Sequence, residues 1–182
     1  MKDLVFKAWI LLAIVAAACL AAPAFGESRS DMGRWRLELS GLNVFSSDGR
    51  HEDGQHYFTL SIEYEFPVSK HGKLGLRLYP LFIHEGDDPI YGAGAGVSAR
   101  LYQHADDYDG LFGELGISAL WHSREFYDNS TRVNFLSEAG IGYQFPKSDW
   151  HVTLKVEHIS NAGLGSHNTG LNGVGMALGY TF

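Results

Sequence analysis

Eight stretches of this chain alternate apolar and polar residues, and the repeated alternation constrains the fold more than any other feature of the sequence. A period of two places successive side chains on opposite faces of a strand, whereas an amphipathic helix repeats every 3.6 residues. Polar segments that contain Gly or Pro separate the stretches, as is typical of turns. We expect strands at residues 34–45, 56–66, 73–82, 92–103, 111–121, 131–145, 150–159 and 171–182.

The length and number of these runs indicate a closed sheet that crosses a membrane. Each run has about the 9 to 11 residues with which a tilted strand spans a bilayer, allowing for ends that extend beyond it. Closure pairs every strand edge, which lipid requires because it offers no hydrogen bonds. An even number of strands also lets the sheet close with both termini of the chain on one side. The expected fold class is therefore all-β, an eight-stranded antiparallel transmembrane β-barrel.

The charges of the alternating runs indicate which face points inward. In the run at 73–82, for example, Leu74 and Leu76 alternate with Lys73 and Arg77. Alternation alone does not separate inside from outside, but balanced charges suit a narrow interior filled by ion pairs, since unpaired charge there would be costly to desolvate. The polar faces carry six basic and six acidic residues: Arg34, Arg36, Lys73, Arg77, Arg100 and Lys155, with Glu38, Glu63, Glu65, Glu114, Glu138 and Glu157.

The first 26 residues have the features of an export signal. Two lysines flank the start of an apolar run at residues 8–20, and small residues lead to Gly26, after which we expect cleavage. The run is shorter than the about 20 apolar residues of a spanning helix, and polar sequence follows at once. A lipoprotein signal that uses Cys19 is the alternative, although three alanines precede this cysteine without the usual leucine. In either case residues 27–182 are the expected barrel domain.

Charge and composition exclude several classes of partner. The formal net charge is −7, and it becomes −8 without the export signal, whose two lysines and one aspartate amount to +1. So acidic a protein is not expected to bind nucleic acid. Cleavage after Gly26 removes the single cysteine, so the mature chain forms no disulfide. The aromatic Phe182 that ends the last run resembles the assembly signal of bacterial outer-membrane barrels, and we therefore expect the outer membrane of a Gram-negative cell.

Connection lengths indicate the direction of the barrel in the membrane. The short connections at 67–72 and 146–149 suit periplasmic turns, although the one at 104–110 is longer than usual. With both termini in the periplasm, the run at 150–159 proceeds outward and ends near the outer leaflet. The longer connections are then expected outside the cell, at residues 46–55, 84–91, 122–130 and 160–170.

Three polar residues occupy the apolar face at that outer end. His158 and Ser160 continue the spacing of Val156 on one run, and Asn172 shares the face of Val174 on the next. Residues two apart lie roughly 6.5 to 7 Å apart along a strand, so a hydroxyl and an imidazole can meet where the strand bends into a loop. These residues are either a nucleophile with its base or interfacial polar side chains at headgroup level.

The last hairpin resembles the signature of the PagL-type lipid A 3-O-deacylase family, which are outer-membrane acyl ester hydrolases. The family pattern is His-x-Ser-Asn-Ala-Gly followed by Asn-x-Gly, and here these elements begin at His158 and Asn168. The resemblance implies that Ser160 attacks an acyl ester of lipid A with His158 as its general base. It also implies an oxyanion site made by Asn168 and a backbone N–H in the turn from Asn161 to Gly163.

One position departs from the family pattern. Where the best-known members have a glutamate that orients the histidine, this chain has Asn172. An amide oxygen can accept a hydrogen bond from imidazole and so fix its tautomer, but it cannot stabilise imidazolium by charge. We expect lower activity or another substrate preference rather than inactivity.

The expected function is removal of an ester-linked 3-hydroxyacyl chain from lipid A, in lipopolysaccharide of the outer leaflet, by a serine esterase. We expect no cofactor and no metal ion, because the histidines show no close ligand spacing. Whether two barrels pair as a homodimer stays open. Two other functions also stay open: a noncatalytic small barrel with a structural or binding role, and a phospholipid esterase of the same mechanism.

Overall fold

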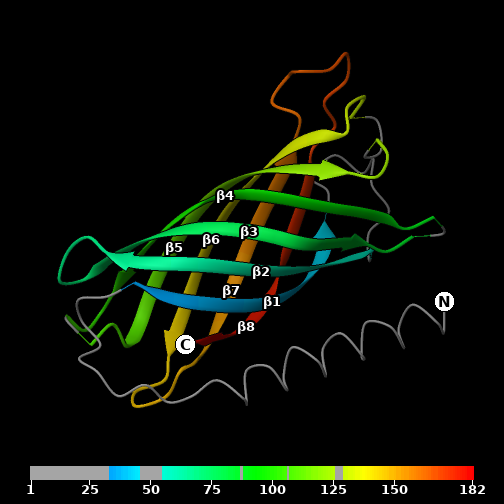
Figure 1. The fold of residues 1–182 in the computed structure, drawn as a ribbon. Helices are drawn as coiled ribbons and strands as arrows, with labels where there is room; N and C mark the ends of the chain where they lie inside the picture. Colours follow the sequence, from blue (N-terminus) through cyan, green and yellow to red (C-terminus); the bar gives the residue numbers. More distant parts are fainter. Residues whose placement is uncertain (1–32, 46–54, 87, 106, 126–128) are drawn as a thin grey trace.

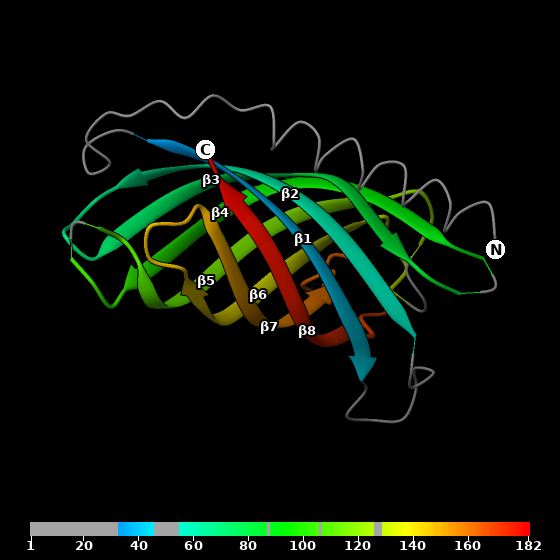
Figure 2. The same ribbon diagram turned by 90° about the horizontal axis from the view of Figure 1, so that it is seen from below.

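The protein is a closed barrel of eight antiparallel strands (Figures 1 and 2). The computed structural model describes residues 33–45, 55–86, 88–105, 107–125 and 129–182, so the expected export signal lies outside the described residues. Each strand pairs with its neighbours in the sequence, and β1 pairs with β8 to close the sheet. The strands are β1 (Arg34–Phe45), β2 (His56–Pro67), β3 (Gly72–His84), β4 (Ile90–Tyr102), β5 (Gly110–His122), β6 (Val133–Gln144), β7 (Trp150–Ser160) and β8 (Leu171–Thr181).

The predicted strands are confirmed, and their ends differ from the observed ones by no more than two residues. The main departure from regular alternation is in β3, where the register against β2 and β4 shifts around Pro80. Proline has no N–H to donate to a sheet, and a bulge is one of the places that tolerate it. The bulge turns both Tyr79 and Phe82 into the interior. No helix in the described part of the chain has the length and apolar character needed to cross a bilayer.

The outer wall is apolar, as the alternation predicts. Large side chains point outward from every strand, and several are more than half exposed, among them Leu76, Leu101, Leu115 and Ile141. Trp35, Trp121 and Trp150 are also exposed and lie at strand ends. An apolar band flanked by aromatic residues is the wall of a membrane barrel.

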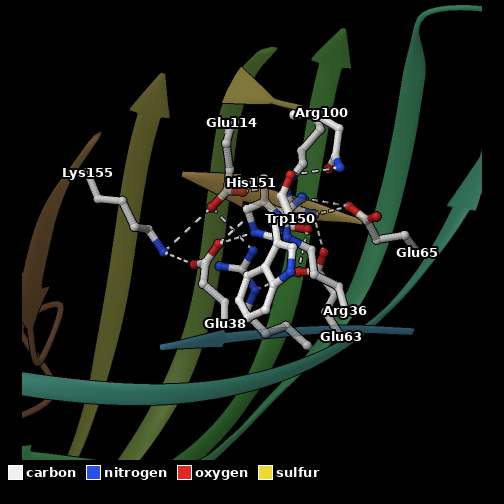
Figure 3. A network of polar contacts seen from close by, with 12 residues as sticks. Arg36, Glu38, Glu63, Glu65, Arg100, Glu114, Trp150, His151 and Lys155 are labelled. Carbon is white, nitrogen blue, oxygen red and sulfur yellow. Dashed lines mark hydrogen bonds and ion pairs between the residues drawn. The ribbon is translucent and has the colours of Figure 1, made fainter. Parts of the chain in front are cut away.

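Ion pairs fill the middle of the barrel (Figure 3). Arg77 contacts Glu63, Glu114 and Glu138, and these side chains are almost completely buried. Lys155 lies 2.9 Å from Glu38 and 2.7 Å from Glu138. The network joins five basic and six acidic residues: Arg36, Lys73, Arg77, Arg100 and Lys155, with Glu38, Glu63, Glu65, Glu114, Glu138 and Glu157.

Arg34 is the one predicted interior charge that the structure places elsewhere. Its guanidinium lies 3.0 Å from Asp149 and both side chains are about a quarter exposed. Arg34 is the first residue of β1, so it reaches the mouth of the barrel instead of the network.

Apolar side chains close both ends of the interior. We call the end that holds the β7–β8 connection the loop end, and the end that holds Phe182 the terminal end. Three aromatic residues, Tyr102, Tyr108 and Phe112, cluster at the terminal end. A larger cluster fills the loop end: Leu42, Val44, Tyr57, Tyr79, Phe82, Ile90, Leu120, Leu136, Ile159 and Leu171. The outer wall of the loop end therefore rests on a solid core.

Candidate active site

The three predicted site residues lie on β7 and β8, two strands that run side by side (Figure 1): His158 and Ser160 on β7, and Asn172 on β8. Along β7, Thr153, Lys155 and Glu157 are buried in the interior, so the opposite parity carries His158 and Ser160 to the outside. His158 is the direct cross-strand partner of Asn172 on β8. Two packed residues anchor this arrangement from within, since the neighbouring positions Ile159 and Leu171 are fully buried.

A hydrogen bond joins His158 to Asn172. His158 Nδ1 lies 2.9 Å from Asn172 Oδ1. An amide oxygen only accepts, so Nδ1 carries the proton and donates it. The other ring nitrogen, Nε2, is then the unprotonated one and can act as a base. The contact predicted between these two residues is present.

A glycine keeps room beside the imidazole. A Cβ atom added at Gly170 would lie 2.6 Å from His158 Cε1 and 3.3 Å from Nε2, which is too close for the ring to stay in place. Gly170 is the last residue before β8, so the connection returns directly over the histidine. The ring is thus held by Asn172 on one side and by backbone on the other.

Ser160 shares the outer face of β7 with His158. Among the described residues, no hydrogen bond joins the Ser160 hydroxyl to the imidazole. Ser160 is half-buried at the end of β7, where it faces Phe135 of β6. Rotation about its single χ1 bond moves the hydroxyl, and catalytic contacts are often long before substrate binds.

A tight turn follows the serine. Leu164 N–H donates to Asn161 C=O over 3.0 Å, and both residues between them, Ala162 (φ 53°) and Gly163 (φ 79°), have positive φ, as in a type I′ turn. Glycine adopts this conformation freely, whereas alanine does so at a steric cost.

Asn161 is a buried linker in this turn. Its side chain is completely inaccessible and makes three hydrogen bonds. Nδ2 donates to the carbonyl oxygens of Asn129 and His167, each over 2.7 Å, and Oδ1 accepts from Gly163 N–H over 2.9 Å. The side chain therefore has no free face for a substrate, and its geometry assigns it to shaping the loop.

Asn168 is exposed on the β7–β8 connection and is held to the turn by one hydrogen bond. Its Oδ1 accepts from Asn161 N–H over 3.0 Å, which fixes the orientation of the amide. The side chain is exposed, and none of the residues that the structure describes accepts a hydrogen bond from its Nδ2. The N–H groups of Asn161 and Gly163 are both engaged. Within the described part of the chain, the N–H of Ala162 has no such partner, so it is the backbone donor that the turn leaves available.

Sequence analysis missed the role of Asn129. This residue lies in the connection between β5 and β6 and is fully buried, and its carbonyl oxygen receives the Asn161 side chain. No spacing pattern links two loop residues 32 positions apart, so only the folded chain reveals the contact. Metal ligands give no alternative site, since no group of three or more His, Cys, Asp or Glu gathers within the described ranges.

The chain is similar to a known protein family and to solved outer-membrane barrels. A profile of the family described as lipid A 3-O-deacylase (PagL) matches residues 32–181. The crystal structure of the outer membrane enzyme PagL is similar with a TM-score of 0.65 and 18% sequence identity, covering 79% of this chain and 98% of that one. The outer membrane protein OprG from Pseudomonas aeruginosa is similar with a TM-score of 0.44 and 12% identity, covering 86% and 99%.

No curated protein is similar enough in sequence to be matched with the chain. The structural likeness to PagL, at 18% identity, shows a shared barrel fold. The family profile extends over almost the whole barrel, including the hairpin that carries His158 and Ser160. The chain therefore belongs to the lipid A 3-O-deacylase (PagL) family, and the protein is a β-barrel of the outer membrane.

Proposed function

We propose that this protein is a serine esterase that removes an ester-linked 3-hydroxyacyl chain from lipid A. Ser160 is the nucleophile, His158 the general base and Asn172 the residue that orients the base. The observation that supports this most strongly is the 2.9 Å contact between His158 Nδ1 and Asn172 Oδ1 on a wall that otherwise faces lipid. Polar side chains are expensive on such a wall, and a hydrogen-bonded pair beside a serine has a chemical use there.

The first half of the reaction forms an acyl-enzyme. Ser160 Oγ attacks the carbonyl carbon of the ester while His158 Nε2 accepts the hydroxyl proton. The tetrahedral intermediate collapses, the bond between carbon and sugar oxygen breaks, and the imidazolium returns its proton to that oxygen. The deacylated glycolipid leaves, and the acyl chain remains on Ser160 as an ester.

The intermediate carries a negative oxygen that needs donors. Asn168 Nδ2 and the N–H of Ala162 fit this role, because the other polar groups of the turn are already engaged. Donors held in place before the reaction stabilise developing charge without reorganising, and loss of one donor typically reduces kcat about 10²- to 10³-fold.

Water completes the cycle. His158 Nε2 removes a proton from a water molecule as its oxygen attacks the acyl carbon, and the second intermediate collapses with the proton returned to Ser160. The products are a free 3-hydroxy fatty acid and the original enzyme. Because His158 and Ser160 lie at the loop end, beside the apolar wall, acyl chains can lie along Val156 and Val174 while water reaches the reacting carbon from the loops.

The decisive experiment incubates the purified full-length protein with lipid A and follows the lipid by mass spectrometry. We expect the loss of one hydroxyacyl chain with the wild-type protein. Ser160→Ala and His158→Ala, which replace side chains on the outer wall and leave the interior intact, should each abolish this loss. Persistence of the reaction in Ser160→Ala would contradict the proposed nucleophile.

The same assay separates the other candidate functions when phospholipid is offered beside lipid A. Release of fatty acid from phospholipid alone would identify a phospholipid esterase with the same residues. Both lipids unchanged by a correctly folded barrel would favour a noncatalytic role.

A further inference from the structure

We infer that Ser130, in the connection between β5 and β6, is a positioning residue that holds Asn168 in place. This inference rests on the proposed function, in which Asn168 is an oxyanion donor. Ser130 lies outside the β7–β8 hairpin that carries the family motif, and no part of the motif points to it.

The Ser130 hydroxyl binds both backbone groups of the residue that precedes Asn168. Its Oγ accepts from His167 N–H over 3.1 Å and donates to His167 C=O over 3.3 Å. One hydroxyl thereby fixes the peptide units on both sides of His167. Because Asn168 is the next residue, its Cα position follows directly from this contact.

The surroundings of Ser130 tie the contact to the barrel. Asn129 Nδ2 donates to Oδ1 of Asn134 on β6 over 2.9 Å, and both residues are fully buried. The Asn129 carbonyl in turn accepts the Asn161 side chain. The segment at 129–130 is thus anchored to the sheet on one side and to the β7–β8 connection on the other.

Two details of the backbone show how closely the two connections fit. Ser130 has a φ of 37°, which non-glycine residues adopt only when their surroundings enforce it. Gly165 packs against it so closely that an added Cβ would lie 2.3 Å from Ser130 Oγ. The glycine at 165 therefore leaves room for the Ser130 hydroxyl between the two connections.

The position of the Asn168 backbone matters because Nδ2, the proposed donor to the oxyanion, lies at the end of a short side chain. Oδ1 is committed to Asn161 N–H, so Nδ2 reaches the intermediate only if the backbone at 168 keeps its place. A misplacement of about 1 Å from a change outside the reacting groups can reduce the rate about 10²-fold. Loss of the Ser130 contact should therefore lower kcat more than it changes KM.

The test is a double-mutant cycle on lipid A hydrolysis with Ser130→Ala, Asn168→Ala and the double variant. We expect Ser130→Ala to reduce kcat about tenfold or more with little change in KM, and to have almost no further effect once Asn168 is alanine. Equal losses in both backgrounds, or full activity of Ser130→Ala, would overturn the inference.

Ser123→Ala is the matched control. Ser123 lies in the same connection, and its hydroxyl accepts a backbone N–H from Tyr91 over 3.2 Å, away from the hairpin. This variant should behave like the wild-type protein. A loss equal to that of Ser130→Ala would show that any weakening of the connection has the same effect, and would overturn the specific role.

Hydrogen exchange gives a readout that does not depend on activity. In a Ser160→Ala background, Ser130→Ala should speed exchange of the His167 N–H, which has lost its acceptor, while amides of the central strands stay protected. This measurement decides the inference even if lipid A proves not to be the substrate. Unchanged exchange at His167 would overturn it.

Discussion

Asn172 gives the proposed site a neutral orienting group. The amide oxygen holds the His158 Nδ1 proton over 2.9 Å and so presents Nε2 as the base, but it carries no charge. During each proton transfer the imidazole becomes a cation, and a hydrogen bond to a charged acceptor is stronger than one to a neutral acceptor by about 1 kcal/mol. The departure from the family pattern is thus expected to affect the transition state more than binding.

Asn172→Glu should therefore raise kcat about five- to tenfold, since about 1.4 kcal/mol corresponds to a factor of ten. Asn172→Leu should lower it by about 10² or more, because nothing then selects the tautomer. Initial rates on lipid A measure both effects. In a His158→Ala background Asn172→Glu should give no gain, and a fall to background in the single variant would contradict the orienting role.

At the scale of elements, the strands β7 and β8 and the connection between them together position His158. β7 and β8 set the register that pairs His158 with Asn172, and Gly170 lets the chain enter β8 beside the ring. The loop contacts then position the donors. The strands thus place the base, while the connection places the groups that stabilise the intermediate.

Gly170→Ala tests this division. The added Cβ would meet His158 Cε1 at 2.6 Å, so the ring or the backbone at residue 170 must move, and we expect the contact with Asn172 to weaken. We expect a loss of activity about 10²-fold or greater with the barrel still folded, as judged by circular dichroism. Gly113→Ala is the control, because its Cβ would meet nothing within 4 Å. Wild-type activity in Gly170→Ala would show that the His158 imidazole tolerates a methyl group at position 170.

The elements differ in how well the sequence predicts them. Strand positions follow from alternation, because each strand faces lipid on one side and, over its middle, polar and charged side chains on the other. The bulge at Pro80 breaks the rule locally, and proline alone does not say on which side the extra residue is accommodated. The pairing of His158 with Asn172 was predictable because adjacent strands joined by one loop must lie side by side.

Contacts between separate connections were not predictable. The sequence predicts a turn at Asn161. In the structure its side chain is buried and donates a hydrogen bond to the carbonyl of Asn129, which belongs to another loop. Likewise, the placement of Arg34 at the mouth instead of the network depends on where β1 starts relative to Asp149. Such contacts depend on three-dimensional proximity that no short-range pattern records.

For the molecule as a whole, the stability of the barrel depends on the completeness of the interior ion-pair network. Buried ion pairs compensate one another's loss of water, and an unpaired member is strongly unfavourable. Arg77 has three carboxylate partners, Glu63, Glu114 and Glu138, more than a surface pair could offer. The barrel that supports the site is therefore sensitive to single changes far from it.

Arg77→Met should lower the free energy of unfolding by about 3 to 5 kcal/mol, because it leaves buried carboxylates without their cation. Arg34→Met, which removes a partly exposed pair with Asp149, should lower it by less than about 1 kcal/mol. Urea titration in lipid vesicles, followed by tryptophan fluorescence, measures both. Equal losses in the two variants would show that burial does not set the strength of these pairs.

A filled interior with the proposed site on its outer surface also determines how substrate arrives. The glycolipid can reach His158 and Ser160 only by lateral diffusion within its own leaflet, so the encounter is two-dimensional. Turnover should then follow the mole fraction of lipid A in the surrounding micelle or vesicle and not its amount per litre. Adding inert detergent at constant lipid A would slow the enzyme by surface dilution, even though nothing in the bulk solution had become scarcer.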